Sequence, residues 1–324
     1  MSPPDRIQTE TLTYGRAAGF DLLAERYETP ERRDRAGKAV VMVHGGAWTS
    51  NDRHSHEVLC RDLASSGLSV FSLDFRDGRN GKHPCAVQDI TAGVRYVRAR
   101  AAAFDIDPDR IGLIGSSSGG HLVLLAAIQP DVDAHRGTPI HADVDAESVS
   151  ARVCCVVALW PVSDPLFRFR YAQRAGREEL VAAHRRYYRD EAHMRQASVQ
   201  RALRAGEMQC LPAALVVQPG EDANVPRPMT LELVREYQDA GGSLNYLFCP
   251  GLPHAFAYQA SAETSRLADQ VRAFSGFAHA SLAASGSYLP CPNVAGHRGR
   301  RDGGVGTAKA RLGETAYYVV ASPL

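Results

Sequence analysis

Short apolar runs alternate with longer amphipathic stretches along most of the chain. The runs have the length and β-branched content of buried parallel strands, and the stretches repeat apolar residues at helical spacing. The predicted strands are 38–43, 68–75, 111–114, 153–160, 211–218 and 244–249. The predicted helices are 51–66, 85–104, 121–128, 226–240 and 261–280. This alternation predicts an α/β fold with a mostly parallel, twisted sheet and helices on both faces.

One stretch precedes this alternation of strands and helices, and another interrupts it. Residues 7–14 and 20–27 have the alternation of an antiparallel hairpin, which we place at the edge of the sheet. Residues 161–208 are helical, with aromatic residues interleaved among ten arginines and only six acidic residues. We predict that this insertion is a helical cap over the carboxyl ends of the strands, where such sheets place substrate pockets. A solvated helical face, with arginine stems covering apolar surface, is the alternative.

The last part of the chain has a different composition. Residues 284–324 contain seven glycines, few periodic apolar residues and a basic cluster at 297–301. A segment of this kind cannot bury enough apolar area to offset the entropy of ordering it. We therefore predict one domain over residues 1–283, with the cap at about 161–208, followed by a flexible tail. Pairing of residues 317–320 as an added strand is the alternative.

The composition of the chain argues against several kinds of partner and cofactor but does not indicate a function. The formal net charge is +1, from 37 basic and 36 acidic residues, so nothing favours binding to nucleic acid or to a membrane surface. An apolar leader and a run of about 18 apolar residues are both missing, and we expect a cytoplasmic protein. The seven cysteines lack C-x-x-C spacing and fit reduced thiols. The aspartates and histidines within 130–150 follow no metal signature, so neither metal nor cofactor is predicted.

The stretch between the strand 111–114 and the helix 121–128 carries the clearest chemistry. Gly115, Ser117 and Gly119 fit G-x-S-x-G, the nucleophile elbow, in which small residues let a serine occupy a strained strand-to-helix turn. A phosphate-binding turn is the alternative, but no Lys-Ser/Thr follows the glycines and no G-x-G-x-x-G opens a nucleotide fold. Ser117 is therefore the candidate nucleophile.

A second glycine-rich turn, His44-Gly45-Gly46-Ala47-Trp48, follows the strand 38–43. Such a turn leaves backbone N–H groups without partners, as an oxyanion hole requires. The candidate donors are the N–H groups of Gly46 and Ala47, with that of Ser118 after the nucleophile. We interpret His44 as a group that braces the loop and Trp48 as a packing or pocket-wall residue.

Two later strands end in loops that offer an acid and a base. Glu221 and Asp222 follow the strand 211–218, and His254 is the single histidine between the last predicted strand and the last helix. Both acids are candidates, and Asp222 is preferred because it lies three residues before the Val-Pro that begins the next helix. The order Ser117, acid, His254 is that of the α/β-hydrolase arrangement, in which imidazole takes the serine proton and a carboxylate orients the imidazole.

Four motifs in order carry a resemblance to a known family. They are HGGAW at 44–48, DPDRIGLIGSSSGGHL at 107–122, G-x-D-x-x-V-P at 220–226 and PHAF at 253–256. From about residue 7 to 280 the chain resembles the α/β-hydrolase superfamily, particularly esterases of the hormone-sensitive-lipase and acetyl-esterase kind, and more distantly kynurenine-formamidase-like hydrolases. The resemblance implies an α/β-hydrolase fold.

The same resemblance assigns roles to residues. It implies Ser117 as nucleophile, Asp222 as acid and His254 as base, with oxyanion donors at Gly46, Ala47 and Ser118. The sequence departs from many relatives at Ala47, where a third glycine is common, and in the serines at 116 and 118 beside the nucleophile. These departures leave the subfamily and the substrate open.

The function expected from the resemblance is hydrolysis of short-chain carboxylic esters through an acyl-enzyme. The substrate would be a small-molecule ester, and the chain would act as a monomer or a homodimer. Hydrolysis of an activated amide such as N-formylkynurenine is the alternative within enzymes, because it needs the same machinery. A ligand-binding protein on a hydrolase scaffold, without catalysis, is the alternative outside them.

Overall fold

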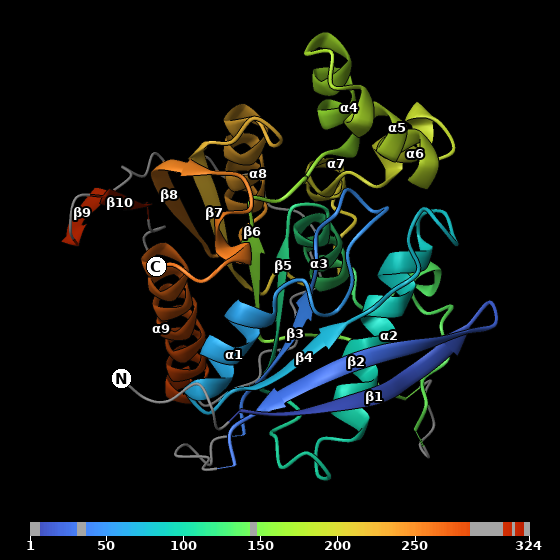
Figure 1. Cartoon of the computed structure of the whole chain (residues 1–324), viewed down its shortest axis with the longest axis vertical. Coiled ribbons are helices and arrows are strands. Elements are labelled where there is room, and N and C mark those ends of the chain that lie inside the picture. Colours follow the sequence, from blue (N-terminus) through green and yellow to red (C-terminus); the bar gives the residue numbers. More distant parts are fainter. Residues whose placement is uncertain (1–6, 31–36, 143–147, 286–306, 313–314, 321–324) are drawn as a thin grey trace.

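The computed structural model of the 324-residue chain describes residues 7–30, 37–142, 148–285, 307–312 and 315–320. Its described strands form one sheet in the order β1-β2-β4-β3-β5-β6-β7-β8-β10-β9 (Figure 1). They are β1 (Gln8–Ala17), β2 (Phe20–Glu28), β3 (Ala39–Val43), β4 (Ser69–Leu73), β5 (Ile111–Ser116), β6 (Cys155–Leu159), β7 (Ala213–Glu221), β8 (Leu244–Pro253), β9 (Thr307–Leu312) and β10 (Thr315–Val320). The neighbours from β4 through β3 to β8 pair in parallel, whereas β1, β2 and β10 run antiparallel to their neighbours.

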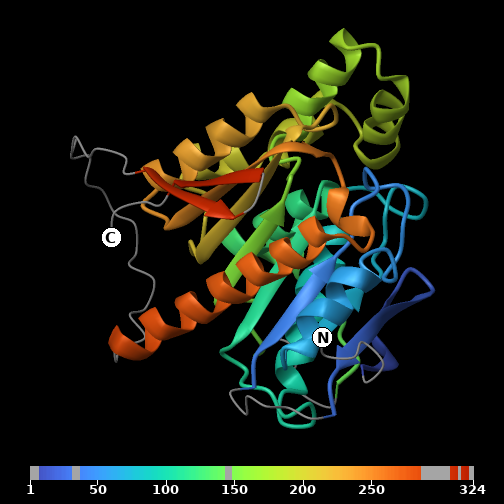
Figure 2. The ribbon, with the colours of Figure 1, turned by 60° about the vertical axis from the view of Figure 1, so that its left-hand side comes forward.

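Helices cover both faces of this sheet. The elements are α1 (Glu57–Ser65), α2 (Cys85–Ala99), α3 (Ser118–Ile128), α4 (Pro165–Arg174), α5 (Glu178–Tyr187), α6 (Glu191–Gln196), α7 (Val199–Arg204), α8 (Arg227–Asp239) and α9 (Ala262–Ser285). The helices α1 and α9 pack against each other on one face (Figure 2). The opposite face is covered by α2, α3 and α8. The predicted doubly covered, mostly parallel sheet is confirmed.

The central strands are apolar because both of their faces are buried. Every residue of β3, β5 and β6 is buried, and their registers align Val41 with Leu113 and Leu113 with Val156. Parallel strands bring their carboxyl ends to one edge of the sheet. The loops that follow β3, β5, β7 and β8 therefore meet there.

Two helices are shorter than the hydrophobic pattern suggests. The helix predicted from residue 51 begins at Glu57, because Asn51 has a φ of 73° and the Asp52 carboxylate accepts a hydrogen bond from the His54 N–H in a local turn. The helix predicted to reach residue 104 ends at Ala99. Residues 101–105 continue as turns, which end at Asp105 with a φ of 50°.

The insertion between β6 and β7 folds into the four helices α4 to α7. These helices lie beyond the carboxyl ends of the central strands, at the top of Figure 1. Three of them begin with side-chain caps: the Asp164 carboxylate accepts from the Phe167 N–H, the Asp190 carboxylate from the His193 N–H, and the Ser198 hydroxyl from the Arg201 N–H.

Part of the predicted tail is also described. The strands β9 and β10 form a hairpin, and β10 pairs antiparallel with β8 through residues 318–320. The alternative in which residues 317–320 pair as an added strand is the one that the structure shows. Residues 286–306, which make up most of the tail before this hairpin, lie outside the described residues.

Candidate active site

Ser117 lies on the turn between β5 and α3, in a backbone conformation that non-glycine residues rarely adopt, with φ 52° and ψ −117°. The flanking glycines are required by close backbone contacts. A Cβ atom at Gly119 would lie 2.3 Å from the carbonyl oxygen of His44, and one at Gly115 would lie 2.5 Å from that of Gly119. The Ser117 N–H donates to the Leu159 carbonyl at 2.8 Å, which ties the turn to β6. The strained, tightly packed turn is that of a nucleophile elbow.

The structure brings His254 and Asp222 to this serine. His254 Nε2 is 3.1 Å from Ser117 Oγ, and His254 Nδ1 is 2.9 Å from Asp222 Oδ2. The other carboxylate oxygen of Asp222 accepts from the backbone N–H groups of Asn224 and Val225, each at 2.8 Å. The Asp222 side chain is 1% exposed and that of His254 is 16% exposed. The imidazole is thus held between a buried carboxylate and the serine hydroxyl.

Glu221, the competing acid, is the last residue of β7 and is exposed. The strand ends at Glu221, and Asp222 is the first residue of the loop whose side chain faces His254. Asp222 is the only acid hydrogen-bonded to the imidazole among the described residues. The preference for Asp222 over Glu221 agrees with this geometry.

The glycine-rich turn after β3 contacts the elbow. Gly46 and Ala47 have positive φ angles of 106° and 52°, and the Trp48 N–H donates to Ser118 Oγ at 3.1 Å. Within the described part of the chain, no acceptor is bound to the backbone N–H of Gly46 or Ala47. Two free N–H groups beside a serine, with a third at the start of α3, can stabilise an oxyanion.

Sequence reasoning missed a buried network behind the elbow. His56 Nε2 is 2.7 Å from Ser116 Oγ, which is 3.0 Å from the hydroxyl of Tyr258, and that hydroxyl accepts from the Gly45 N–H at 3.3 Å. Burial lowers the pKa of His56 to about 3, so its ring is neutral. The network links the residue before Ser117 to the glycine-rich turn. Of these residues, the sequence marks only Ser116, which departs from the pattern of the family.

His44 and Trp48 both contribute to packing around this turn. The His44 ring stacks on Phe75 with centroids 4.3 Å apart, and its Nδ1 lies 2.8 Å from the Gly45 carbonyl oxygen. Trp48 is buried and stacks on Tyr187 of α5 at 5.7 Å, and its indole N–H donates to His121 Nδ1 at 3.3 Å. The tryptophan therefore connects the glycine-rich turn to the helical insertion.

The insertion also contacts the loop that carries the acid. The Tyr171 hydroxyl and the Arg177 guanidinium both donate to the Ala223 carbonyl, at 2.9 and 3.2 Å. Arg177 also donates to the side-chain oxygen of Asn224 at 2.8 Å. Because the insertion touches both the turn after β3 and the loop after β7, it borders the candidate site on two sides.

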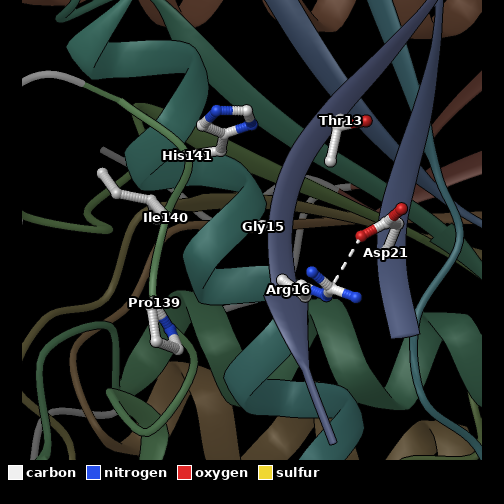
Figure 3. Close-up of a pocket in the computed structure, with 7 residues that line it drawn as sticks. All are labelled: Thr13, Gly15, Arg16, Asp21, Pro139, Ile140 and His141. Carbon is white, nitrogen blue, oxygen red and sulfur yellow. Dashed lines mark ion pairs between the residues drawn. The ribbon is translucent and has the colours of Figure 1, made fainter. Parts of the chain in front are cut away.

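A surface hollow lies elsewhere, at the edge of the sheet (Figure 3). It is lined by β1, β2 and residues 139–141, and the ion pair of Arg16 with Asp21, 3.4 Å apart, is mostly solvent-exposed. Two strands, β4 and β3, separate this edge from β5 and the elbow. The hollow therefore belongs to a different part of the molecule from the Ser117 site.

The described residues include neither a metal-binding cluster nor a membrane-spanning helix. Among them, no set of three or more His, Cys, Asp or Glu side chains is arranged to hold a metal ion. The described helices also include none whose length and apolarity would let it cross a bilayer. In the segment 130–150, Asp131 pairs with Arg136 at 3.0 Å and accepts from the Ala151 N–H.

The strand order, the elbow and the two later loops together define an α/β-hydrolase fold. Solved structures with this fold superpose on the chain. An esterase of Thermogutta terrifontis with bound propionate gives a TM-score of 0.63 at 23% identity, covering 86% of this chain and 94% of that one. Esterase B from Lactobacillus Rhamnosis gives a TM-score of 0.71 at 21% identity, covering 87% and 90%.

The family is shown by sequence. Residues 27–234 match the BD-FAE family, and the chain belongs to it. Ethyl acetate hydrolase of Pseudomonas putida is 29% identical over 182 residues, which cover 56% of this chain and 52% of that protein. Esterase LipC of Mycobacterium tuberculosis is 27% identical over 277 residues, which cover 80% and 64%. The chain thus aligns with about half to two thirds of the length of these two relatives.

Proposed function

We propose that this protein is a serine hydrolase that cleaves carboxylic esters through an acyl-enzyme, without a cofactor. The observation that carries the proposal is the continuous hydrogen-bonded series from Ser117 Oγ through His254 to Asp222, with distances of 3.1 and 2.9 Å. A serine hydroxyl is a weak nucleophile until a positioned base takes its proton. His254 can act as that base because its other nitrogen is held by the buried carboxylate of Asp222.

The reaction has two halves. Ser117 Oγ attacks the ester carbonyl carbon while His254 Nε2 takes the hydroxyl proton, and the N–H groups of Gly46, Ala47 and Ser118 stabilise the negative oxygen. The C–O bond to the alcohol then breaks, and the imidazolium gives its proton to the leaving alcohol. Water attacks the acyl-enzyme with the same proton transfers, and the free acid and Ser117 are released.

Several findings favour esters over the formamide alternative. The relatives compared above are an ethyl acetate hydrolase and esterases, and the superposed structures are esterases. We expect short-chain esters as substrates, in line with the name of the ethyl acetate hydrolase. The insertion α4 to α7 is, in this proposal, the cap that closes the substrate pocket against Trp48 and the loop after β7.

The proposal is tested by covalent labelling and turnover. Wild-type protein should react with a fluorophosphonate probe, hydrolyse p-nitrophenyl esters and prefer them to N-formylkynurenine. Ser117→Ala should not be labelled and should lose about 10⁴- to 10⁶-fold in kcat. Ser116→Ala, which keeps Ser117, should still be labelled. Turnover by Ser117→Ala within tenfold of wild type would exclude Ser117 as the nucleophile.

A further inference from the structure

The insertion buries a cation that no acid neutralises. Arg168, on α4, is 1% exposed, and no carboxylate lies within ion-pair distance of it among the described residues. Its Nε donates to His184 Nε2 at 3.3 Å, whereas its Nη2 is buried and has no hydrogen-bond partner there. A buried guanidinium without a carboxylate is costly, because the charge has left water without compensation.

The surroundings of Arg168 do not remove its charge. Burial lowers the pKa of Arg168 to about 10, with Tyr188 and then Asp222 opposing this effect, so the group is cationic at neutral pH. His184 is neutral, since burial lowers its pKa to about 3, and it can accept the Nε–H bond. Arg177 is a further cation near Arg168 and adds repulsion instead of compensation.

A second unpartnered donor lies beside the guanidinium. The Tyr188 hydroxyl is fully buried and has no hydrogen-bond partner in the described part of the chain. Burial raises the pKa of Tyr188 well above its usual value, so the phenol keeps its proton and can donate it. Both Arg168 and Tyr188 pack on Trp48, with the guanidinium 5.2 Å from the indole ring and the phenol ring 5.2 Å from it.

Trp48 connects this pair of donors to the proposed catalytic site. Trp48 follows Ala47 directly, and its N–H is bound to Ser118 Oγ. The charge of Asp222, which holds His254, also acts on Arg168. A cation and a phenol that converge on the same indole, beside the oxyanion turn, have the donor chemistry that recognises a carboxylate.

We propose that Arg168 and the Tyr188 hydroxyl bind a carboxylate carried by the ester substrate, an inference that rests on the proposed ester hydrolysis. The substrates would then be half-esters of dicarboxylic acids or esters of hydroxy acids, rather than neutral esters. Guanidinium and carboxylate match in charge and in planar geometry, and a carboxylate supplies the missing acceptors for both donors.

The test compares matched esters that differ by a carboxylate in place of a methyl group. In the first pair, monomethyl succinate carries the carboxylate on its acyl group and methyl butyrate is its neutral match. In the second pair, 3-acetoxypropanoate carries the carboxylate on its alcohol group and propyl acetate is its neutral match. Acid release at constant pH gives kcat/KM for each. Wild type should favour the charged ester at least tenfold in one pair, and Arg168→Met should abolish that preference, mainly through KM.

Two further variants separate binding from structure. Arg168→Lys keeps the charge but not the planar fork, so its preference should fall between those of wild type and Arg168→Met. Arg174→Met removes an exposed cation from the same helix and should keep the wild-type preference. Equal preference in wild type and Arg168→Met, or no preference for either charged ester in wild type, would overturn the inference.

A binding measurement distinguishes failure of this inference from failure of ester hydrolysis. Ser117→Ala protein should bind monomethyl succinate more tightly than methyl butyrate in calorimetry, and the added Arg168→Met change should abolish the difference. If that difference appears while wild type hydrolyses no ester, the carboxylate site stands and ester hydrolysis fails. If wild type hydrolyses methyl butyrate through Ser117 and Ser117→Ala binds both esters equally, ester hydrolysis stands and the carboxylate site is refuted.

Discussion

Lowering the pH should destabilise this protein through its buried histidines. His56, His121 and His184 are fully buried, and burial lowers their pKa values to about 3, 4 and 3 from the ordinary 6.5. Between pH 6.5 and about 4 the unfolded chain binds more protons at these sites than the folded chain does. Their contribution to the free energy of unfolding is therefore complete above pH 6.5 and is lost as the pH falls below it.

The size of the effect follows from proton linkage. At pH 5 a histidine that titrates at 6.5 when unfolded, and far lower when folded, favours unfolding by about 2 kcal/mol. Three such groups together give about 6 kcal/mol, which is comparable with the whole stability of an ordinary domain. We expect the protein to be close to unfolding at pH 5 and stable at pH 7.5.

Urea unfolding between pH 7.5 and 5 measures this loss, and a matched pair of variants assigns it. His56→Gln removes one buried titrating group, whereas His54→Gln removes an exposed histidine two residues away. Below pH 6, the stability of His56→Gln should fall less steeply than that of His54→Gln, by about 1.4 kcal/mol per pH unit. Equal slopes for the two variants would show that His56 does not become protonated on unfolding.

Three other changes test separate parts of the structure. Asp222→Asn should lower kcat by about 10⁴-fold, while Glu221→Gln, measured in the same ester assay, should lower it less than tenfold; the reverse result would move the acid to Glu221. Gly119→Ala should cost about 3 kcal/mol in urea unfolding, because its Cβ would lie 2.3 Å from a backbone oxygen, and a loss under 1 kcal/mol would mean that β3 yields easily. Truncation after Ser285 removes the hairpin but only three residues paired with β8, so esterase activity should persist with a melting temperature lowered by less than about 10 °C; an insoluble product would show that the hairpin is required.

Much of the architecture could be predicted from local pattern. The apolar runs identified six of the central strands, because strands buried on both faces must be apolar throughout. The elbow could be predicted because only glycine fits two residues before and two residues after Ser117 on a turn this tight. The positions of Asp222 and His254 followed from the rule that loops at the carboxyl ends of parallel strands carry chemistry.

Contacts between distant side chains could not be predicted in the same way. Spacing from the next helix favoured Asp222 over Glu221, but the contact of Asp222 with a histidine 32 residues away appears only in the tertiary structure. The network joins His56 to Ser116 across 60 residues and Ser116 to Tyr258 across 142 residues, and it follows no sequence motif. The periodicity of the local sequence does not predict contacts between side chains so far apart in the chain.

The insertion shows most clearly where sequence reasoning ends. Its arginines looked alike along the chain, but the structure exposes Arg174 and buries Arg168 beside Trp48 and Tyr188. The hairpin of β9 and β10 is a second case, since its glycine-rich surroundings predicted a loose tail and the open edge of β8 supplied a partner for β10. Composition and period set which segments become helices and strands, whereas packing between segments decides which charges lose their water and which strand edges are paired.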